Sequence, residues 1–170
     1  NRATTLASRA FGDAPPPRSV AASPLGAAWE ATRRDAVAAL ERNALHDWLG
    51  ALWGFVGMAN KFVDTEKPWE LAKAAKSGDA AAEERLRDVL GDLLESCRLI
   101  SLYAAPAMPT IAAKIWTLLG RVWPYDEHGH NGPSLDEIGT WGALGPAGSL
   151  GAPTPLFPRL EADALDAPAD

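Results

Sequence analysis

Residues 43–73, NALHDWLGALWGFVGMANKFVDTEKPWELAK, contain the pattern that decides the fold class. Apolar side chains recur there every three or four residues, the spacing of one face of an α-helix, and predict a helix over 43–64. Proline is favoured at a first helical position, so Pro68 followed by Trp69 predicts a short second helix that ends near residues 76–78. The apolar positions of the first helix are Leu45, Trp48, Leu49, Leu52, Val56, Ala59 and Val63.

The rest of residues 1–123 shows the same helical spacing. It predicts helices over 1–11, 25–40, 79–104 and 110–119, the second capped by Ser23 and Pro24 and the last closed by Gly120. Alanine is abundant while valine and isoleucine are scarce, a composition that favours helix over sheet. We therefore predict an all-α fold, an antiparallel helix bundle over 1–123 whose first helix is truncated at its N-terminus.

Residues 124–170 differ in composition from the bundle. The stretch 124–155 is rich in Gly, Pro and Asn, and it predicts an irregular segment that packs back on the bundle. We expect Trp141, Leu144, Leu156 and Phe157 to anchor this segment, and 161–170 to form a frayed acidic tail. The predicted division of the chain is thus 1–123 and 124–170.

The composition excludes several classes of protein. No apolar run reaches the roughly 20 residues that cross a bilayer, so no membrane partner is expected. The single cysteine, Cys97, cannot form an intrachain disulfide or a cysteine-built zinc site, and a cytoplasmic location is expected. The net charge of −6 disfavours a broad phosphate-binding surface, so DNA is not an expected partner.

Candidate catalytic and metal sites are few. His128 and His130 have a spacing that suits a metal, but no third ligand converges on them, and a solvated polar turn is the favoured interpretation. Cys97 lies on the apolar face of its helix, which indicates packing rather than nucleophilic chemistry. The glycine-rich stretch 142–151 lacks the lysine and the following helix of a phosphate-binding loop. We expect no catalytic residue, no metal site and no cofactor in this chain.

Tryptophan is the residue that most needs an explanation. Trp69 follows a proline, stands at a helix start and has Lys67 and Lys73 as neighbours. Two interpretations stay open from the residues alone: its ring packs under the preceding loop, or it stacks on a nucleic-acid base. Core burial is the prediction for the others at helical or post-helical positions, namely Trp29, Trp48, Trp53, Trp116 and Trp123.

Four stretches of the chain resemble one known family. NKFVDTEKPWELAK, residues 60–73, resembles the anticodon-binding domain of the methionyl-tRNA synthetase family, whose pattern is Asn-x-Tyr and then Pro-Trp-x-Leu-Ala-Lys. Phe62 takes the tyrosine position. The other three stretches are NRATTLASR at 1–9, LESCRLISLYAAPAMPTIAAKIWTLLG at 94–120 and PLFPRLE at 155–161, and all four come in the family's order.

The resemblance implies a fold and a set of binding residues. The fold would be the helix bundle of class Ia anticodon-binding domains, and its ligand would be the CAU anticodon loop of tRNA(Met). Trp69 with Pro68 would form a platform that stacks on the first anticodon base. Arg9 would contact the anticodon bases or backbone, and Thr5 stands where relatives carry Asn or Arg. Asn60 would first brace the turn that orients Trp69, with RNA contact as its second role.

The resemblance also implies a longer parent enzyme. That enzyme would be a methionine–tRNA ligase that uses ATP with Mg, on a catalytic domain that lies upstream and is the second expected partner of this chain. The catalytic signatures His-x-Gly-His and Lys-Met-Ser-Lys-Ser do not occur in the sequence. Two other interpretations stay open, a helical protein-interaction module and the anticodon-binding domain of a related leucine, isoleucine, valine or cysteine enzyme.

Overall fold

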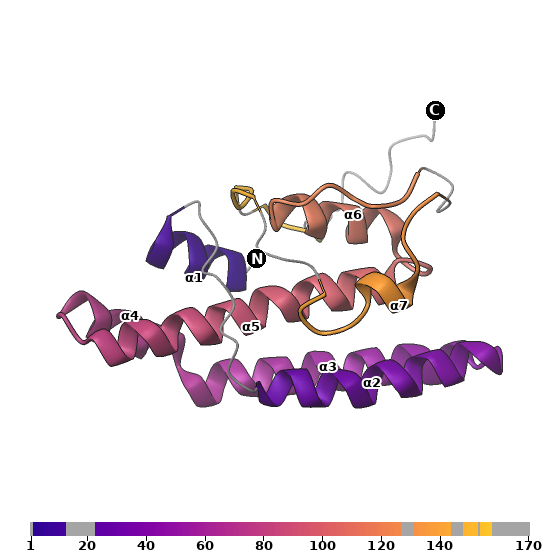
Figure 1. Cartoon of the computed structure of the whole chain (residues 1–170), viewed down its shortest axis with the longest axis horizontal. Helices are drawn as coiled ribbons and strands as arrows, with labels where there is room; N and C mark the ends of the chain where they lie inside the picture. The colour runs from indigo at the N-terminus through magenta and orange to yellow at the C-terminus, as the bar shows by residue number, and fades with distance from the viewer. Residues whose placement is uncertain (1, 13–22, 127–130, 144–147, 153, 158–170) are drawn as a thin grey trace, which may run out of the picture.

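The computed structural model describes residues 2–12, 23–126, 131–143, 148–152 and 154–157. Over these residues it is all-helical and contains no strand, which confirms the predicted fold class (Figure 1). None of its helices combines the length and the apolarity that crossing a bilayer requires. The helices are α1 (Arg2–Phe11), α2 (Pro24–Glu41), α3 (Leu45–Glu66), α4 (Pro68–Lys76), α5 (Ala80–Ala104), α6 (Pro109–Leu118) and α7 (Leu135–Ile138).

The helices begin and end at residues whose chemistry satisfies the free backbone groups. The Ser23 hydroxyl accepts hydrogen bonds from the backbone N–H groups of Leu25 and Gly26 at the start of α2, at 3.2 and 3.3 Å. The Asp79 carboxylate accepts from the N–H of Ala82 at 3.0 Å and caps α5 in the same way. After α6 the chain turns at Gly120, whose φ of +69° suits a residue without a side chain.

The longest helix, α5, is the centre of the bundle. Figure 1 shows it running between the α2–α3 pair on one side and α1 with α6 on the other, and it contacts all four as well as α4. The largest buried side chain, Trp29, packs edge-on against the rings of Phe55 and Tyr103, each with 5.0 Å between centroids. Three helices thus meet at one aromatic cluster, which fixes how α2, α3 and α5 are arranged.

Residues 134–142 cross α5 and are held there by buried polar contacts. Arg98 on α5 is 1% exposed and pairs with Glu95 at 2.7 and 2.8 Å. Its guanidinium also donates to the backbone carbonyls of Ile138 and Thr140. Glu95 accepts the N–H of Gly142 at 2.6 Å. The ion pair therefore holds the strap, defined here as residues 134–142, in place on α5.

The strap contains a helical turn, although irregular backbone was predicted throughout 124–155. The turn is α7, and it begins with a capping box in which Ser134 and Glu137 each accept the other's backbone N–H. The hydrogen bonds that Ser134 donates, first from its backbone N–H, stabilise the charged carboxylate and lower the pKa of Glu137. Trp141, a predicted anchor, packs its half-buried ring over Gly26, whose missing side chain leaves the room for it.

Two of the predicted core residues are solvent-exposed. Trp53 is 54% exposed because it lies on the outer side of α3, beside glycines that have open space around them. Phe157 is 70% exposed, and Leu150 is the buried apolar residue of the C-terminal segment instead. The predicted anchor Leu144 and the predicted tail 161–170 lie outside the described residues. The predictions for Trp29, Trp48 and Trp116 are confirmed, and Trp123 is half-buried with its ring against Trp116.

Candidate nucleic-acid interface

A groove of about 610 Å³ lies between α1, α4 and the first turns of α5. Apolar side chains such as Leu6 and Leu86 form part of its lining. Basic side chains from all three helices stand around it, together with one exposed indole. The basic residues are Arg9, Lys73, Lys76 and Arg87, and the indole is that of Trp69; the acidic Glu83 and the ring of Phe11 also line the groove.

The exposure of Trp69 follows from the turn between α3 and α4. Lys67 has φ +46° and ψ +61°, so it ends α3 and starts α4 within one residue. Its N–H donates to the carbonyl of Val63 at 3.0 Å, and its own carbonyl accepts from the N–H of Glu70 at 2.8 Å. Pro68 follows with a ring that is completely buried. The next side chain is directed outward, and Trp69 is 42% exposed.

The burial of Pro68 corrects one predicted site residue. A ring that is enclosed by protein atoms cannot present a face to a base, so Pro68 is not part of a stacking platform. Its fixed φ instead starts α4 sharply after the left-handed Lys67. The Trp69 ring is 42% exposed, so it is not enclosed under the preceding loop, and its stacking on a base stays a prediction.

One face of α1 carries the other predicted contacts. Arg2, Thr5 and Arg9 recur at a spacing of three and four residues, which places them on the same side of the helix. Arg9 is exposed and lines the groove together with Trp69. Thr5 is half-buried on the same helix face. The guanidinium carbon of Arg2 lies over the Trp69 ring, 5.7 Å from its centroid.

Asn60 is not the brace that the sequence suggested. It lies on the exposed side of α3, two helical turns before Lys67. In the part of the chain that the structure describes, no side-chain hydrogen bond joins Asn60 to the α3–α4 turn, which backbone hydrogen bonds close instead. A contact between Asn60 and RNA stays a prediction.

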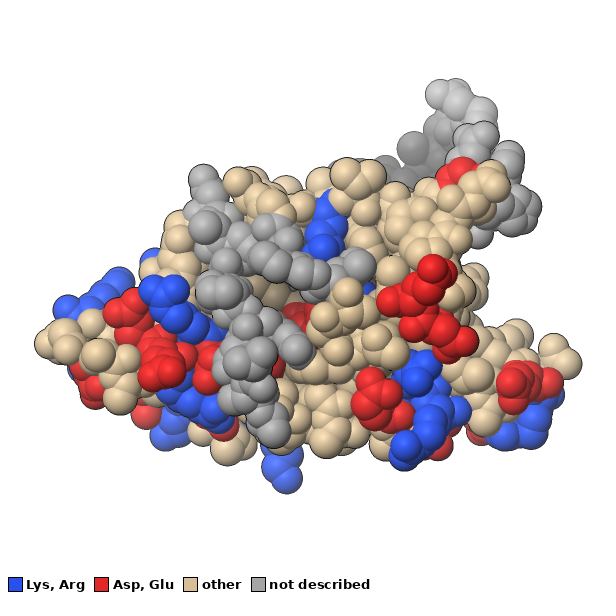
Figure 2. Space-filling view, in the orientation of Figure 1, with Lys and Arg blue, Asp and Glu red and all other residues tan. Residues whose placement is uncertain are grey.

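The charge around the groove is local. Lys73 and Lys76 form no ion pair with any residue that the structure describes, whereas Arg87 pairs with Glu83 at 2.6 Å. Lys67, at the helix start, pairs with Glu70 at 3.3 Å. Figure 2 shows basic and acidic side chains intermixed over the α4 end of the face in view, with no broad basic area. Such a site can stack on a base and bind a few phosphates, which suits a looped-out single strand.

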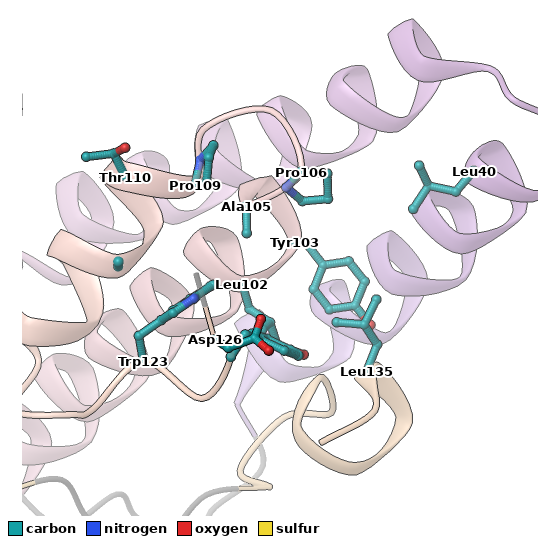
Figure 3. Close-up of a pocket in the computed structure, with 12 residues that line it drawn as sticks. Leu40, Leu102, Tyr103, Ala105, Pro106, Pro109, Thr110, Trp123, Asp126 and Leu135 are labelled. Carbon is teal, nitrogen blue, oxygen red and sulfur yellow. The ribbon is translucent and has the colours of Figure 1, made fainter. Parts of the chain in front are cut away.

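A second cavity, of about 640 Å³, lies at the other end of α5 (Figure 3). Tyr103, Pro106, Trp123 and Leu135 line it, with Asp126 as its one acidic group. Burial raises the pKa of Tyr103, so its hydroxyl stays protonated at neutral pH. No motif in the sequence pointed to this cavity, because its walls come from four separate segments that only the fold brings together.

The sequence predicted no metal site and no nucleophilic cysteine. Within the described ranges no three His, Cys, Asp or Glu side chains converge as metal ligands would. His128 and His130 lie outside those ranges. Cys97 is partly buried, and desolvation raises the pKa of its thiol, which favours the protonated form.

Comparison with known proteins shows what the chain is related to. No family model matches it. It is 30% identical over 142 residues to a methionine–tRNA ligase of Synechocystis sp. and 34% identical over 121 residues to that of Mycobacterium bovis. The chain is homologous to a segment of the methionine–tRNA ligases. The match covers 82% and 71% of this chain but only 26% and 21% of those two ligases, so the chain spans about a quarter of their length.

The fold supports the same relationship. The crystal structure of the apo form of Mycobacterium tuberculosis methionyl-tRNA synthetase superimposes with a TM-score of 0.73 and 27% sequence identity. The superposition covers 94% of this chain and 30% of that synthetase. The methionyl-adenylate-bound structure of the same synthetase gives a TM-score of 0.72. The structural similarity to methionyl-tRNA synthetase therefore covers nearly the whole chain.

Proposed function

We propose that this chain is the anticodon-reading part of a methionine–tRNA ligase and that the groove between α1, α4 and α5 binds the CAU anticodon loop of tRNA(Met). The observation that carries the proposal is the position of Trp69. Its half-exposed indole stands at the tip of α4 and shares one groove with Arg9 from α1. The homology to methionine–tRNA ligases supplies the class of RNA.

The groove provides each contact that a splayed anticodon base needs. The flat face of Trp69 would stack on the first anticodon base, an interaction worth about 1–3 kcal/mol. Arg9 forms no ion pair with any residue that the structure describes, so its guanidinium beside Trp69 would be able to donate to base edges or to the sugar–phosphate backbone. Lys73 and Lys76 continue the basic edge of α4, where phosphates that flank the base would lie.

The low positive charge of the surface agrees with this type of recognition. A protein that reads a single-stranded loop relies on stacking and on a few hydrogen bonds, whereas non-specific binding requires a wide basic face. The net charge of the chain is −6. We infer that binding here depends on the loop's unstacked bases more than on its overall charge.

The chemistry of the parent ligase would be carried by other residues. Attachment of methionine to tRNA with ATP and Mg would take place on an upstream catalytic domain, and this chain would contribute recognition of the tRNA. The catalytic domain and the anticodon loop are therefore its two proposed partners.

Binding of a CAU anticodon stem-loop tests the proposal. Trp69→Ala should weaken binding by about 5- to 150-fold, the equivalent of one stacking contact. Trp53→Ala is the matched control, because that indole is also exposed but lies on α3 away from the groove. It should leave the dissociation constant unchanged. Equal effects of the two substitutions, or no binding by the unmodified chain, would contradict the proposal and favour a protein-interaction module.

A further inference from the structure

Arg2 has a contact that neither the fold nor the proposed anticodon contacts explain. It is an exposed residue in the first turn of α1, and its guanidinium lies over the Trp69 ring at 5.7 Å from the centroid. It forms no ion pair with any described residue. It is not among the residues that line the groove. The side chain therefore reaches the ring of Trp69 without being part of the groove lining.

The contact between the Arg2 guanidinium and the Trp69 ring suggests where a base would lie when RNA binds. Stacked bases are separated by about 3.4 Å, so a base held between two flat groups needs those groups about 6.8 Å apart. The guanidinium carbon lies 5.7 Å from the ring centroid, a distance that includes any sideways offset of the two groups. Because Arg2 is exposed, its long side chain can move outward and admit one base between the guanidinium and the ring. A guanidinium plane is also a common stacking partner for unpaired bases in RNA recognition.

We propose that Arg2 and Trp69 form a clamp that holds the first anticodon base between the guanidinium and the indole, an inference that rests on the proposed function. Arg2 is then a specificity-determining residue in addition to Arg9. The planarity of the guanidinium matters for this role, because lysine is a point charge that cannot present a flat face to a base. In the absence of RNA the same two groups make a cation–π contact, which keeps the arginine over the ring.

The alternative roles of Arg2 make different predictions. A plain phosphate contact would depend on charge alone, so lysine would replace arginine. An arginine that only covers the ring would compete with the base, and its removal would tighten binding. The clamp predicts instead that full affinity requires both the first anticodon base and a planar cation at position 2.

The test measures dissociation constants for two stem-loops, one with the intact CAU anticodon and one whose first anticodon nucleotide is abasic. Arg2→Gln should weaken binding of the intact loop about 2- to 5-fold, as expected for an exposed cation–π contact. It should leave binding of the abasic loop unchanged, since the phosphates are the same and only the base is missing. Arg2→Lys should behave like Arg2→Gln. Arg34→Gln is the matched control, because Arg34 is exposed on α2 and has the same charge.

Each other outcome overturns a defined part of the reasoning. If Arg2→Gln weakens both loops equally, or if Arg2→Lys restores full binding, Arg2 contacts a phosphate and the clamp is wrong. Tighter binding by Arg2→Gln would show that the arginine blocks the ring. If the unmodified chain binds intact and abasic loops equally, the proposed function itself fails. If Trp69→Ala removes that preference while Arg2→Gln does not alter it, the proposed function holds and only the clamp fails.

Discussion

Replacement of Arg98 by methionine should destabilise the bundle strongly. Arg98 is 1% exposed, and its guanidinium pairs with Glu95 while also donating to two strap carbonyls, those of Ile138 and Thr140. Methionine fills a similar volume but offers no donor. The substitution therefore leaves the buried Glu95 carboxylate without its hydrogen-bonded cation and the Ile138 carbonyl without a donor, whereas the Thr140 carbonyl keeps the hydrogen bond from the N–H of Ala143 at 3.3 Å.

The magnitude follows from these contacts. Loss of one partner from a buried ion pair costs about 3–5 kcal/mol, and each buried carbonyl left without a donor costs about 1–3 kcal/mol. The costs are not additive, because the strap can move to expose the carbonyls to water. We expect Arg98→Met to lower the free energy of unfolding by about 4 kcal/mol, a large part of the 5–15 kcal/mol that is typical of a domain.

Urea denaturation followed by far-UV circular dichroism measures this free energy, and Glu95→Gln sharpens the test. In the unmodified chain Glu95→Gln should be destabilising, because it removes the partner of a buried arginine. In the Arg98→Met background it should be stabilising, because it removes the unpaired charge and keeps an acceptor for the N–H of Gly142. A cost below about 1 kcal/mol for Arg98→Met, or the same sign for Glu95→Gln in both backgrounds, would refute the reasoning.

Three further predictions use the same unfolding measurement or a thiol assay. Trp29→Ala should cost about 3–5 kcal/mol because its ring is completely buried, whereas Trp53→Ala, more than half exposed, should cost less than about 1 kcal/mol; similar costs would contradict the burial pattern. Gly54→Ala should stabilise α3 by about 0.5–1 kcal/mol since open space surrounds it, and Gly120→Ala should destabilise by more than about 2 kcal/mol because its φ is positive and a new Cβ would meet backbone carbonyls. Desolvation raises the pKa of the partly buried Cys97, so alkylation near pH 8.5 should be slower in the folded chain than in the urea-unfolded chain. The stability that this thiol contributes is complete below the unfolded pKa and should fall as pH rises through the folded pKa. Equal alkylation rates in both states would contradict this.

The sequence predicted the elements of the bundle well because their signals are local. The period of apolar residues in α3 and the Pro68–Trp69 start of α4 require no knowledge of distant contacts. The exposure of Trp53 was missed because Trp53 directly follows Leu52, a residue of the buried apolar stripe of α3. Successive side chains of a helix are rotated by about 100°, so Trp53 points away from that stripe. Helical spacing alone does not show where the buried face of such a helix ends.

The buried ion pair and the strap could not be predicted in the same way. Glu95 and Arg98 stand three residues apart, a spacing that on most helices indicates a solvated surface pair. In the fold the pair is buried in the centre of the bundle, and the strap, about 40 residues further along the chain, crosses it. The Ser134-x-x-Glu137 signature of α7 was visible in the sequence, but it lies in a Gly- and Pro-rich stretch that favoured an irregular prediction.

The candidate site contains residues that local sequence signals could predict and residues whose positions depend on distant contacts. Exposure of Trp69 could be foreseen as one of two outcomes from its place after a proline, and the resemblance added Arg9. The position of Arg2 over the indole could not be foreseen, because α1 and α4 are more than 50 residues apart in the chain and only the fold brings them into contact. Pro68 was predicted to be part of an exposed stacking surface, but its ring is buried. The sequence could not show this, because burial of a ring depends on which distant residues pack over it.

The most direct test of the proposed function is the difference in affinity of the unmodified chain for two anticodon stem-loops that differ in one base. One carries CAU and the other AAU, so the stem, the loop length and the charge are identical. If the groove reads the first anticodon base, the chain should bind the CAU loop at least about 5-fold more tightly, the lower end of what one good base contact contributes. Equal affinity for the two loops would contradict the assignment of this chain to anticodon reading.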